Sequence, residues 1–215
     1  MSATSLCNAD FGNNASIAHL PRLRDFFTLP PSGHLYAYPG LMSPGDQAAF
    51  VEATEADAVL LNASSTVEWE FTGTWAGAIK DYVPRYAARG IVRALFSVNV
   101  PYMIPVVEFA HDEYFKVLNG TAGGRVILFR PNEWRGTSGG LIPPFMLNAT
   151  AFAARINAYP RGTVSHIYMT SDGGANLADF GSLAAALDEH VQIVPPGALA
   201  DLALQSRGLL SHDNE

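Results

Sequence analysis

The chain has 215 residues, of which 48% are hydrophobic and 15% charged, and its formal net charge is -7. This length and composition suit one folded domain with a sizeable core, and they exclude a disordered chain. The acidic balance argues against nucleic acid or an anionic membrane surface as the main partner. No apolar run is long enough to span a bilayer, because Asn99, Pro101 and Pro105 interrupt the best candidate.

The first predicted elements lie between residues 43 and 90. Ser43 followed by Pro44 predicts a helix that runs to about Ala56, with Ser43 as its cap. The short apolar run 59–61 predicts a buried strand. Residues 74–88 have helical periodicity, and Pro84 is expected to kink or split that helix.

Strand-like and helical stretches alternate along the rest of the chain. Strands are predicted at 91–98, 125–129, 164–170 and 191–194, and helices at 149–158, 179–189 and 196–206. This alternation predicts βα units and a mostly parallel sheet with helices outside it, which is an α/β fold. We expect a loose polar segment at 1–16, a single domain at 17–208 and a polar tail at 209–215.

Two tyrosines lie two residues apart between turn-forming residues, in Gly33-His34-Leu35-Tyr36-Ala37-Tyr38-Pro39. In an extended backbone, Tyr36 and Tyr38 would point to the same side and could stack on a flat ligand such as a sugar ring. The alternative is a strand that buries both tyrosines in the core.

This segment resembles the signature of the GxGYxYP family of glycoside hydrolase-like proteins. Gly33, Tyr36, Tyr38 and Pro39 match the signature, and Leu35 stands in place of its second glycine. Further similarity to the end of the family's C-terminal domain, at 153–158 and 191–196, extends the resemblance over most of residues 20–207.

The resemblance implies a modified TIM-type barrel and a carbohydrate ligand. A full barrel needs about 250 residues and eight βα units, whereas we count about five or six units here. We therefore expect an incomplete, TIM-barrel-like layer. An acidic motif expected upstream of the signature has no counterpart, so the chain resembles the latter part of a longer family member. A missing N-terminal half or a homo-oligomer would then cover an exposed sheet edge.

Glycoside hydrolysis usually needs two carboxylates that flank the scissile bond, and parallel α/β folds place catalytic groups after their strands. Glu133 and Asp172 each follow a predicted strand, so they are the candidate acid/base pair. Trp134 beside Glu133, together with Tyr36, Tyr38 and Trp69, would supply sugar platforms. The alternatives are a solvated loop acid for Glu133 and a turn residue or cap for Asp172. A non-catalytic carbohydrate-binding protein is the second functional hypothesis.

Two other acidic groups are weaker candidates. Glu68 and Glu70 flank Trp69 at a spacing of two, so both carboxylates would face one way in a strand and raise each other's pKa. They form either an acid/base pair or a solvated strand face opposite a buried Trp69. The cluster of Glu108, His111, Asp112 and Glu113 forms either a rim site or a charged helix face.

Other chemistries have little support in the sequence. Residues 136–140 fit the G-x-S-x-G pattern around Ser138, but the strand and helix that a nucleophile elbow needs do not flank it directly. The six histidines lack the spacing of a zinc helix, and His166 is interpreted as a satisfied core histidine. No phosphate-binding or dinucleotide motif is present, so no cofactor or metal is expected.

The compartment is left open by the sequence. Asn14, Asn62, Asn119 and Asn148 each begin a glycosylation sequon, which favours a secreted parent protein. The alternative is coincidence in a chain rich in turns. No signal peptide is visible at the N-terminus, and Cys7 is the only cysteine, so it cannot form an internal disulfide.

Overall fold

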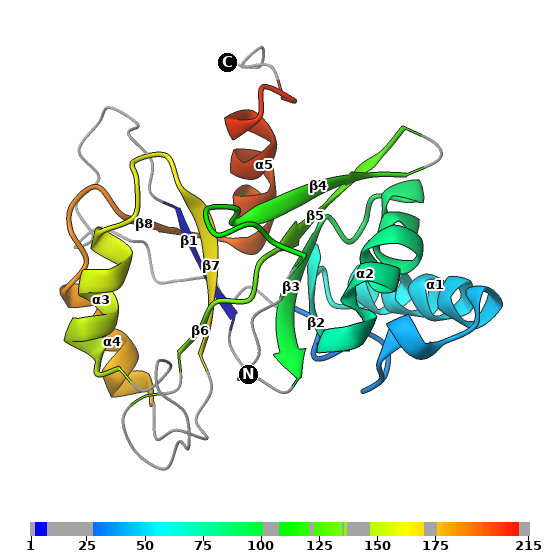
Figure 1. Cartoon of the computed structure of the whole chain (residues 1–215), viewed down its shortest axis with the longest axis horizontal. Helices are drawn as coiled ribbons and strands as arrows, with labels where there is room; N and C mark the ends of the chain where they lie inside the picture. The colour runs from blue at the N-terminus through cyan, green and yellow to red at the C-terminus, as the bar shows by residue number, and fades with distance from the viewer. Residues whose placement is uncertain are drawn as a thin grey trace.

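The computed structural model describes residues 3–7, 28–100, 108–120, 123–134, 136, 147–169 and 176–210. In these ranges the chain forms a mixed α/β fold with two four-stranded sheets, which we name sheet A and sheet B (Figure 1). Within the described residues, no helix is long and apolar enough to cross a membrane.

Sheet B is the mostly parallel sheet that the sequence predicts. In sheet order it contains β2 (Ser65–Phe71), β3 (Ala94–Val100), β5 (Arg125–Phe129) and β4 (Phe115–Asn119). β2, β3 and β5 are parallel to one another, and β4 pairs with β5 in the antiparallel direction. β4 is an addition to the sequence prediction, and it makes one edge of the sheet a hairpin.

Sheet A combines strands from both ends of the chain. In sheet order it contains β6 (Glu133–Trp134), β7 (Val164–Met169), β1 (Ala3–Cys7) and β8 (Gln192–Val194). β6 and β7 are parallel, whereas β1 is antiparallel to both β7 and β8. The expectation of a loose segment at 1–16 is therefore wrong for residues 3–7, because their backbone pairs on both sides with other strands. The remainder of 1–16 lies outside the described residues.

The helix α1 (Pro44–Leu60) begins as predicted, since the Ser43 side chain accepts a hydrogen bond from the Asp46 amide. It continues past Ala56 through the apolar run that predicted a strand. That prediction is wrong, and Leu60 is 82% exposed at the end of the helix.

The stretch between β2 and β3 is helical but changes type along its length. It consists of η3 (Thr72–Thr74), α2 (Trp75–Gly77), the π-helical η4 (Ala78–Tyr82) and the 3₁₀-helical η5 (Val83–Ala88). The change from η4 to η5 occurs next to Pro84, which has no amide hydrogen to continue a regular helix. The predicted split of this helix is confirmed. A further 3₁₀ turn, η2 (Pro39–Leu41), precedes α1.

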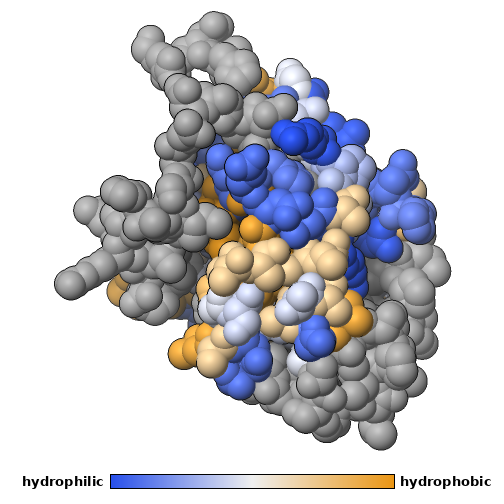
Figure 2. All heavy atoms as spheres, turned by 90° about the vertical axis from the view of Figure 1, so that its left-hand side faces the viewer, coloured by the Kyte–Doolittle hydropathy of each residue, from blue (hydrophilic) through white to orange (hydrophobic). Residues whose placement is uncertain are grey.

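The outer side of sheet A carries two capped helices. α3 (Ala149–Asn157) has Asn148 as its predicted cap, and α4 (Leu177–Ala185) begins with a capping box between Asn176 and Asp179. Their core residues pack on the sheet with Trp134 and Ile167. Figure 2 looks onto this side of the molecule and shows orange and tan apolar residues interspersed with blue polar ones.

The final helix, α5 (Pro196–Ser206), stands between the two sheets (Figure 1). Leu199, Ala200, Ala203 and Leu204 form one core cluster with residues of β3, β4, β5 and β7. In the described part of the chain no strand of sheet A pairs with a strand of sheet B, so the strands form no closed barrel. The α/β class is confirmed, and the TIM-barrel-like arrangement is not.

Candidate functional site

The segment that carries the two tyrosines is a series of bends and not a strand. The Gly33 amide bonds to the Pro30 carbonyl, and Gly33 has a φ of 109°, which favours glycine. Among the described non-glycine residues only Asn62 has a positive φ, so the backbone at Leu35 needs no glycine. The rings of Tyr36 and Tyr38 nevertheless meet edge to face, with 6.2 Å between their centroids.

β2 brings two further aromatic rings to these tyrosines. The centroids of Tyr36 and Trp69 lie 5.1 Å apart, and those of Tyr38 and Phe71 lie 4.4 Å apart. We call Tyr36, Tyr38, Trp69 and Phe71 the aromatic surface. Tyr36 is 63% exposed and Phe71 is 40% exposed, while Tyr38 and Trp69 are half-buried. The aromatic surface therefore offers ring faces and edges to solvent at the C-terminal end of a parallel strand.

Buried polar groups fix the tyrosine segment against β2. The Ser32 hydroxyl donates to the Ala37 carbonyl at 2.6 Å and accepts from the Trp69 amide at 3.2 Å. On the other side of the tyrosines, the Gly40 amide donates to the Glu70 carboxylate. A Cβ atom on Gly40 would lie 2.7 Å from Glu70 Oε2, so a larger residue at this position would displace the Glu70 carboxylate.

Glu68 and Glu70 do face one way, as predicted, but they face the helical stretch between β2 and β3 and not solvent. Both side chains are fully buried, whereas Trp69 on the opposite side is half-buried. The Tyr82 hydroxyl donates to Glu68 Oε2 at 3.1 Å, and the Thr74 hydroxyl donates to Glu70. The solvated strand face is therefore wrong, because tyrosine and threonine hydroxyls from the helical stretch supply the hydrogen bonds that water would otherwise supply.

Burial also determines the ionisation of this pair. It raises the pKa of Glu68 well above the usual value, and the nearby Glu70 raises it further. Burial raises the pKa of Glu70 as well, although hydrogen bonds from Thr74 and Gly40 lower it in part. A carboxyl with a raised pKa can act as a general acid, but neither of these has an exposed oxygen at which to meet a substrate.

Glu133 begins the two-residue strand β6, which pairs with the C-terminal end of β7. It is 2% exposed and sits directly opposite Tyr168 of β7, so both side chains project to the same face of the sheet. Tyr168 packs there with Val67 and Val98 of sheet B, and Trp69 packs against this cluster. The structure therefore brings Glu133 to the same inter-sheet face as part of the aromatic surface. Asp172 lies outside the described residues.

Trp134 is a core residue, which corrects its prediction as a sugar platform. It is 1% exposed, and its indole ring stacks on Phe152 with 5.3 Å between centroids and an 8° angle between planes. Its Nε1 donates to the Leu147 carbonyl at 2.8 Å. Helix α3 supplies the stacking partner, so this ring has no face left for a ligand.

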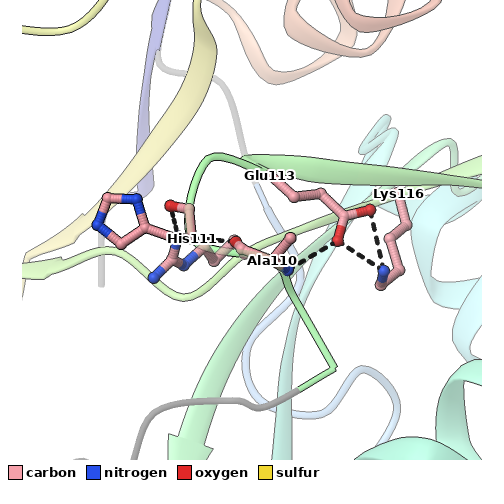
Figure 3. A network of polar contacts seen from close by, with 5 residues as sticks. Ala110, His111, Glu113 and Lys116 are labelled. Atoms are coloured by element: carbon pink, nitrogen blue, oxygen red, sulfur yellow. Dashed lines mark hydrogen bonds and ion pairs between the residues drawn. The ribbon is translucent and has the colours of Figure 1, made fainter.

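The acidic cluster around Glu113 forms a turn that leads into β4, and not the charged helix face that was one of its two interpretations. Figure 3 shows the Glu113 carboxylate accepting from the Ala110 amide at 3.1 Å and pairing with Lys116 at 2.7 Å. The Arg130 guanidinium donates to the His111 carbonyl at 2.6 Å. The Glu113 carboxylate therefore has a backbone partner in Ala110 and a charged partner in Lys116.

Two further sequence candidates have different outcomes. Ser138 lies outside the described residues. His166 is in the core, as predicted, but neither of its ring nitrogens has a hydrogen-bond partner among the described residues, so it is not a satisfied histidine. Among all the residues that the structure describes, no group of three or more histidine, cysteine, aspartate or glutamate side chains could hold a metal ion.

Phe71 is the member of the aromatic surface that sequence reasoning missed. It follows Trp69 by two residues, and the spacing that relates Tyr36 to Tyr38 would have identified it. Ser32 and Glu70 were not predicted as residues that hold the segment, because their contacts join positions 30 or more residues apart.

Comparison with known proteins adds evidence on the fold. No protein-family model matches the chain, and no curated protein matches it. The structure is similar to the crystal structure of a "putative hydrolase" from Bacteroides thetaiotaomicron, with a TM-score of 0.60 and 14% sequence identity. The similarity covers 87% of this chain and 34% of that one, so this chain spans about a third of the length of that protein. The resemblance to the GxGYxYP family is not confirmed.

Proposed function

We propose that this protein is carbohydrate-active and binds a glycan on the aromatic surface. The observation that carries the proposal is the partly exposed cluster of four rings at the end of β2, with Tyr36 63% and Phe71 40% exposed. Aromatic rings bind the apolar C–H faces of sugars, and tyrosine adds a hydroxyl that can bond to sugar hydroxyls. Large apolar side chains gathered at the surface of a protein mark a binding site.

Binding is better supported than hydrolysis at this surface. Glu68 and Glu70 are the carboxylates nearest to it along the chain, and both are fully buried and bonded toward the helices. A sugar seated on Tyr36 and Trp69 would therefore meet aromatic carbon and tyrosine hydroxyls before either of these two carboxylates. A glycan-binding protein without catalysis is the function that this geometry supports best.

The double variant Tyr36→Ala with Tyr38→Ala tests the binding surface. Each lost ring contact should cost about 1 kcal/mol, so the Kd for an oligosaccharide should rise about 30-fold for the pair. Isothermal titration calorimetry against cello-, xylo-, chito- and malto-oligosaccharides measures this change. Leu177→Ala is the matched control, because Leu177 is 80% exposed on α4, outside the aromatic surface. Unchanged affinity in a folded double variant would exclude the tyrosines from the binding site.

Hydrolysis is the second candidate, and the position of Glu133 favours it. Glu133 begins the two-residue strand β6, and Asp172 follows the last residue of the adjacent strand β7 by three positions. Carboxylates from neighbouring strands can reach the separation of about 5–5.5 Å for retention or about 6.5–9.5 Å for inversion. The similarity in fold to a protein called a putative hydrolase supports this candidate.

Glu133→Gln separates the two candidates. If Glu133 is catalytic, this variant should release no reducing sugar from an oligosaccharide. The Kd of the variant for that oligosaccharide should stay within about twofold of the wild-type value, because glutamine has nearly the same shape as glutamate. Glu113→Gln is the control, since the Glu113 carboxylate belongs to the turn before β4. Wild-type protein that binds glycans but releases no sugar would leave binding as the function and remove Glu133 from catalysis.

A further inference from the structure

The Glu70 carboxyl group joins the segment that carries the tyrosines to the helical stretch after β2. Its Oε1 accepts from the Gly40 amide, two residues after Tyr38, and its Oε2 contacts the Thr74 hydroxyl. Glu70 is fully buried, so it meets no ligand itself. Any effect of Glu70 on the aromatic surface must therefore pass through the position of the tyrosine segment.

The hydrogens available at Thr74 indicate the protonation state in which this arrangement is complete. The Thr74 hydroxyl lies 2.9 Å from the Phe71 carbonyl and also contacts the Glu70 carboxyl, but it has one hydrogen to donate. If that hydrogen goes to the carbonyl, Glu70 Oε2 must carry a proton and donate it to Thr74. A neutral Glu70 therefore completes all the contacts together. An ionised Glu70 takes the Thr74 hydrogen away from the Phe71 carbonyl.

The surroundings of Glu70 also favour its neutral form. Burial raises the pKa of Glu70, although its own hydrogen bonds lower it in part. Glu68 lies on the same face of β2, and the two carboxyls repel each other when both are ionised. Among the described residues, no basic side chain forms an ion pair with either carboxyl. Ionisation of Glu70 therefore favours a state in which its carboxylate reaches water.

The other ionisable groups near this site have partners of their own. They lie on the tyrosine segment, on α1 and on the helical stretch, and they form three pairs: His34 with Asp57, Glu55 with Arg89, and Tyr82 with Tyr86. Burial raises the pKa of both tyrosine hydroxyls, so this third pair stays neutral. Glu68 is the neighbour whose charge couples to that of Glu70.

We propose that Glu70 positions the glycan site as a neutral acid, and that its ionisation releases the tyrosine segment and weakens glycan binding. This inference rests on the glycan-binding function proposed above and adds regulation of that site by pH. The backbone at Gly40 lies directly against the carboxyl, so the segment must move before water can reach Glu70. The segment in place holds the proton more tightly than the released segment. Its position is therefore favoured at acid pH, and this preference is lost as the pH rises through the pKa of Glu70.

Calorimetry with the tightest-binding oligosaccharide of the panel tests the proposal. From about pH 5 to about pH 9 the wild-type Kd should rise at least about threefold, and by at most about tenfold per pH unit, the limit for one proton. Glu70→Gln keeps an acceptor for Gly40 and a donor for Thr74, so its Kd should stay within about twofold of the wild-type value at acid pH. Glu113→Gln makes the same change in the turn before β4 and should keep the wild-type pH profile.

Gly40→Ala tests the same contact from the other side. Gly40 is not among the described glycines with a positive φ, so its backbone accepts alanine, but the added Cβ would displace the Glu70 carboxylate. The Kd at acid pH should rise at least about fivefold. In a Glu70→Ala background the same change should have no further effect, because the two positions share one contact. Additive effects would contradict a role of Glu70 through Gly40, and this cycle decides even if Glu70→Gln fails to fold.

A measurement without ligand separates this proposal from the proposed function. In ¹⁵N-labelled wild type the Gly40 amide resonance should titrate with pH, and the cross-peaks between the rings of Tyr36 and Trp69 should weaken in parallel. Both should stay constant in Glu70→Gln. If wild type binds no glycan while Gly40 titrates, the glycan function fails and Glu70 still controls the segment. A Gly40 amide that does not titrate, or equal pH dependence in wild type and Glu70→Gln, would overturn the proposal.

Discussion

Three buried ionisable residues show how burial controls charge in this fold. Burial raises the pKa of Glu68 and of Glu70 above their ordinary value of 4.5, and it lowers the pKa of His166 from 6.5 to about 3. The His166 ring stacks on Phe96, with 5.0 Å between centroids, and lies edge to face with Phe129. All three groups are therefore held in their neutral forms over part of the pH range in which the unfolded chain would charge them.

These shifts have opposite effects on stability as the pH changes. The unfolded chain protonates its histidines near pH 6.5 while folded His166 stays neutral to about pH 3, so stability is lost as pH falls between these values. Folded Glu68 and Glu70 keep protons that the unfolded chain loses above about pH 4.5, so their stability contribution is lost as pH rises through the folded pKa. Above about pH 6.5 His166 is neutral in both the folded and the unfolded state, so it no longer contributes to the pH dependence.

Glu68→Gln should reduce the loss of stability that occurs as the pH rises above about 4.5. Each proton held only in the folded state gives a slope of up to about 1.4 kcal/mol per pH unit, and glutamine cannot lose that proton. It still offers an oxygen to the Tyr82 hydroxyl. Urea unfolding at a series of pH values measures the slope, and the variant and wild type should converge near pH 4. Parallel curves for the two proteins would show that Glu68 does not titrate between the two states.

At the scale of elements, locally encoded features were predicted well. The caps at Ser43 and Asn148 follow from the side chain and its next three residues, and both are confirmed. The bounds of α5 at 196–206 were also predicted as observed. The split at Pro84 follows from the missing amide hydrogen of proline. Such features depend on few neighbours, so one sequence contains the information they need.

Elements defined by distant partners could not be predicted in the same way. β6 is a strand because two residues pair with Tyr168 and Met169, more than 30 positions later. β1 has little hydrophobic pattern and exists through backbone pairing with β7 and β8. The exposed run at Val59–Leu61 has strand-like composition, but it ends a capped helix.

The same distinction holds in the candidate site. The period-two spacing correctly placed Glu68 and Glu70 on one side of β2, but it could not say which side faces the helices. Trp134 was predicted to be available to a ligand because its neighbour Glu133 follows a strand, whereas its burial depends on Phe152 of α3. Aromatic residues whose partners are close in sequence, such as Tyr36 and Tyr38, were brought together as expected.

At the scale of the whole molecule, α5 packs against both sheets and joins them through a shared core. Its buried residues share a core cluster with Phe96 and Phe129 of sheet B and with Val164 of sheet A. No strand pair joins the sheets in the described residues, so side-chain packing carries much of the coupling between them. The inter-sheet contacts of Tyr168 with Val67 and Val98 add to it near the aromatic surface.

Leu199→Ala should therefore weaken both sheets together. Leu199 is fully buried, and its truncation should cost about 3 kcal/mol of unfolding free energy, through lost burial and the cavity that remains. Because its cluster spans the sheets, hydrogen exchange of the amides in β3 and in β7 should accelerate by the same factor. Leu177→Ala, at a position that is 80% exposed, should change stability by less than about 0.5 kcal/mol. Faster exchange confined to one sheet would show that the sheets unfold independently and that α5 does not couple them.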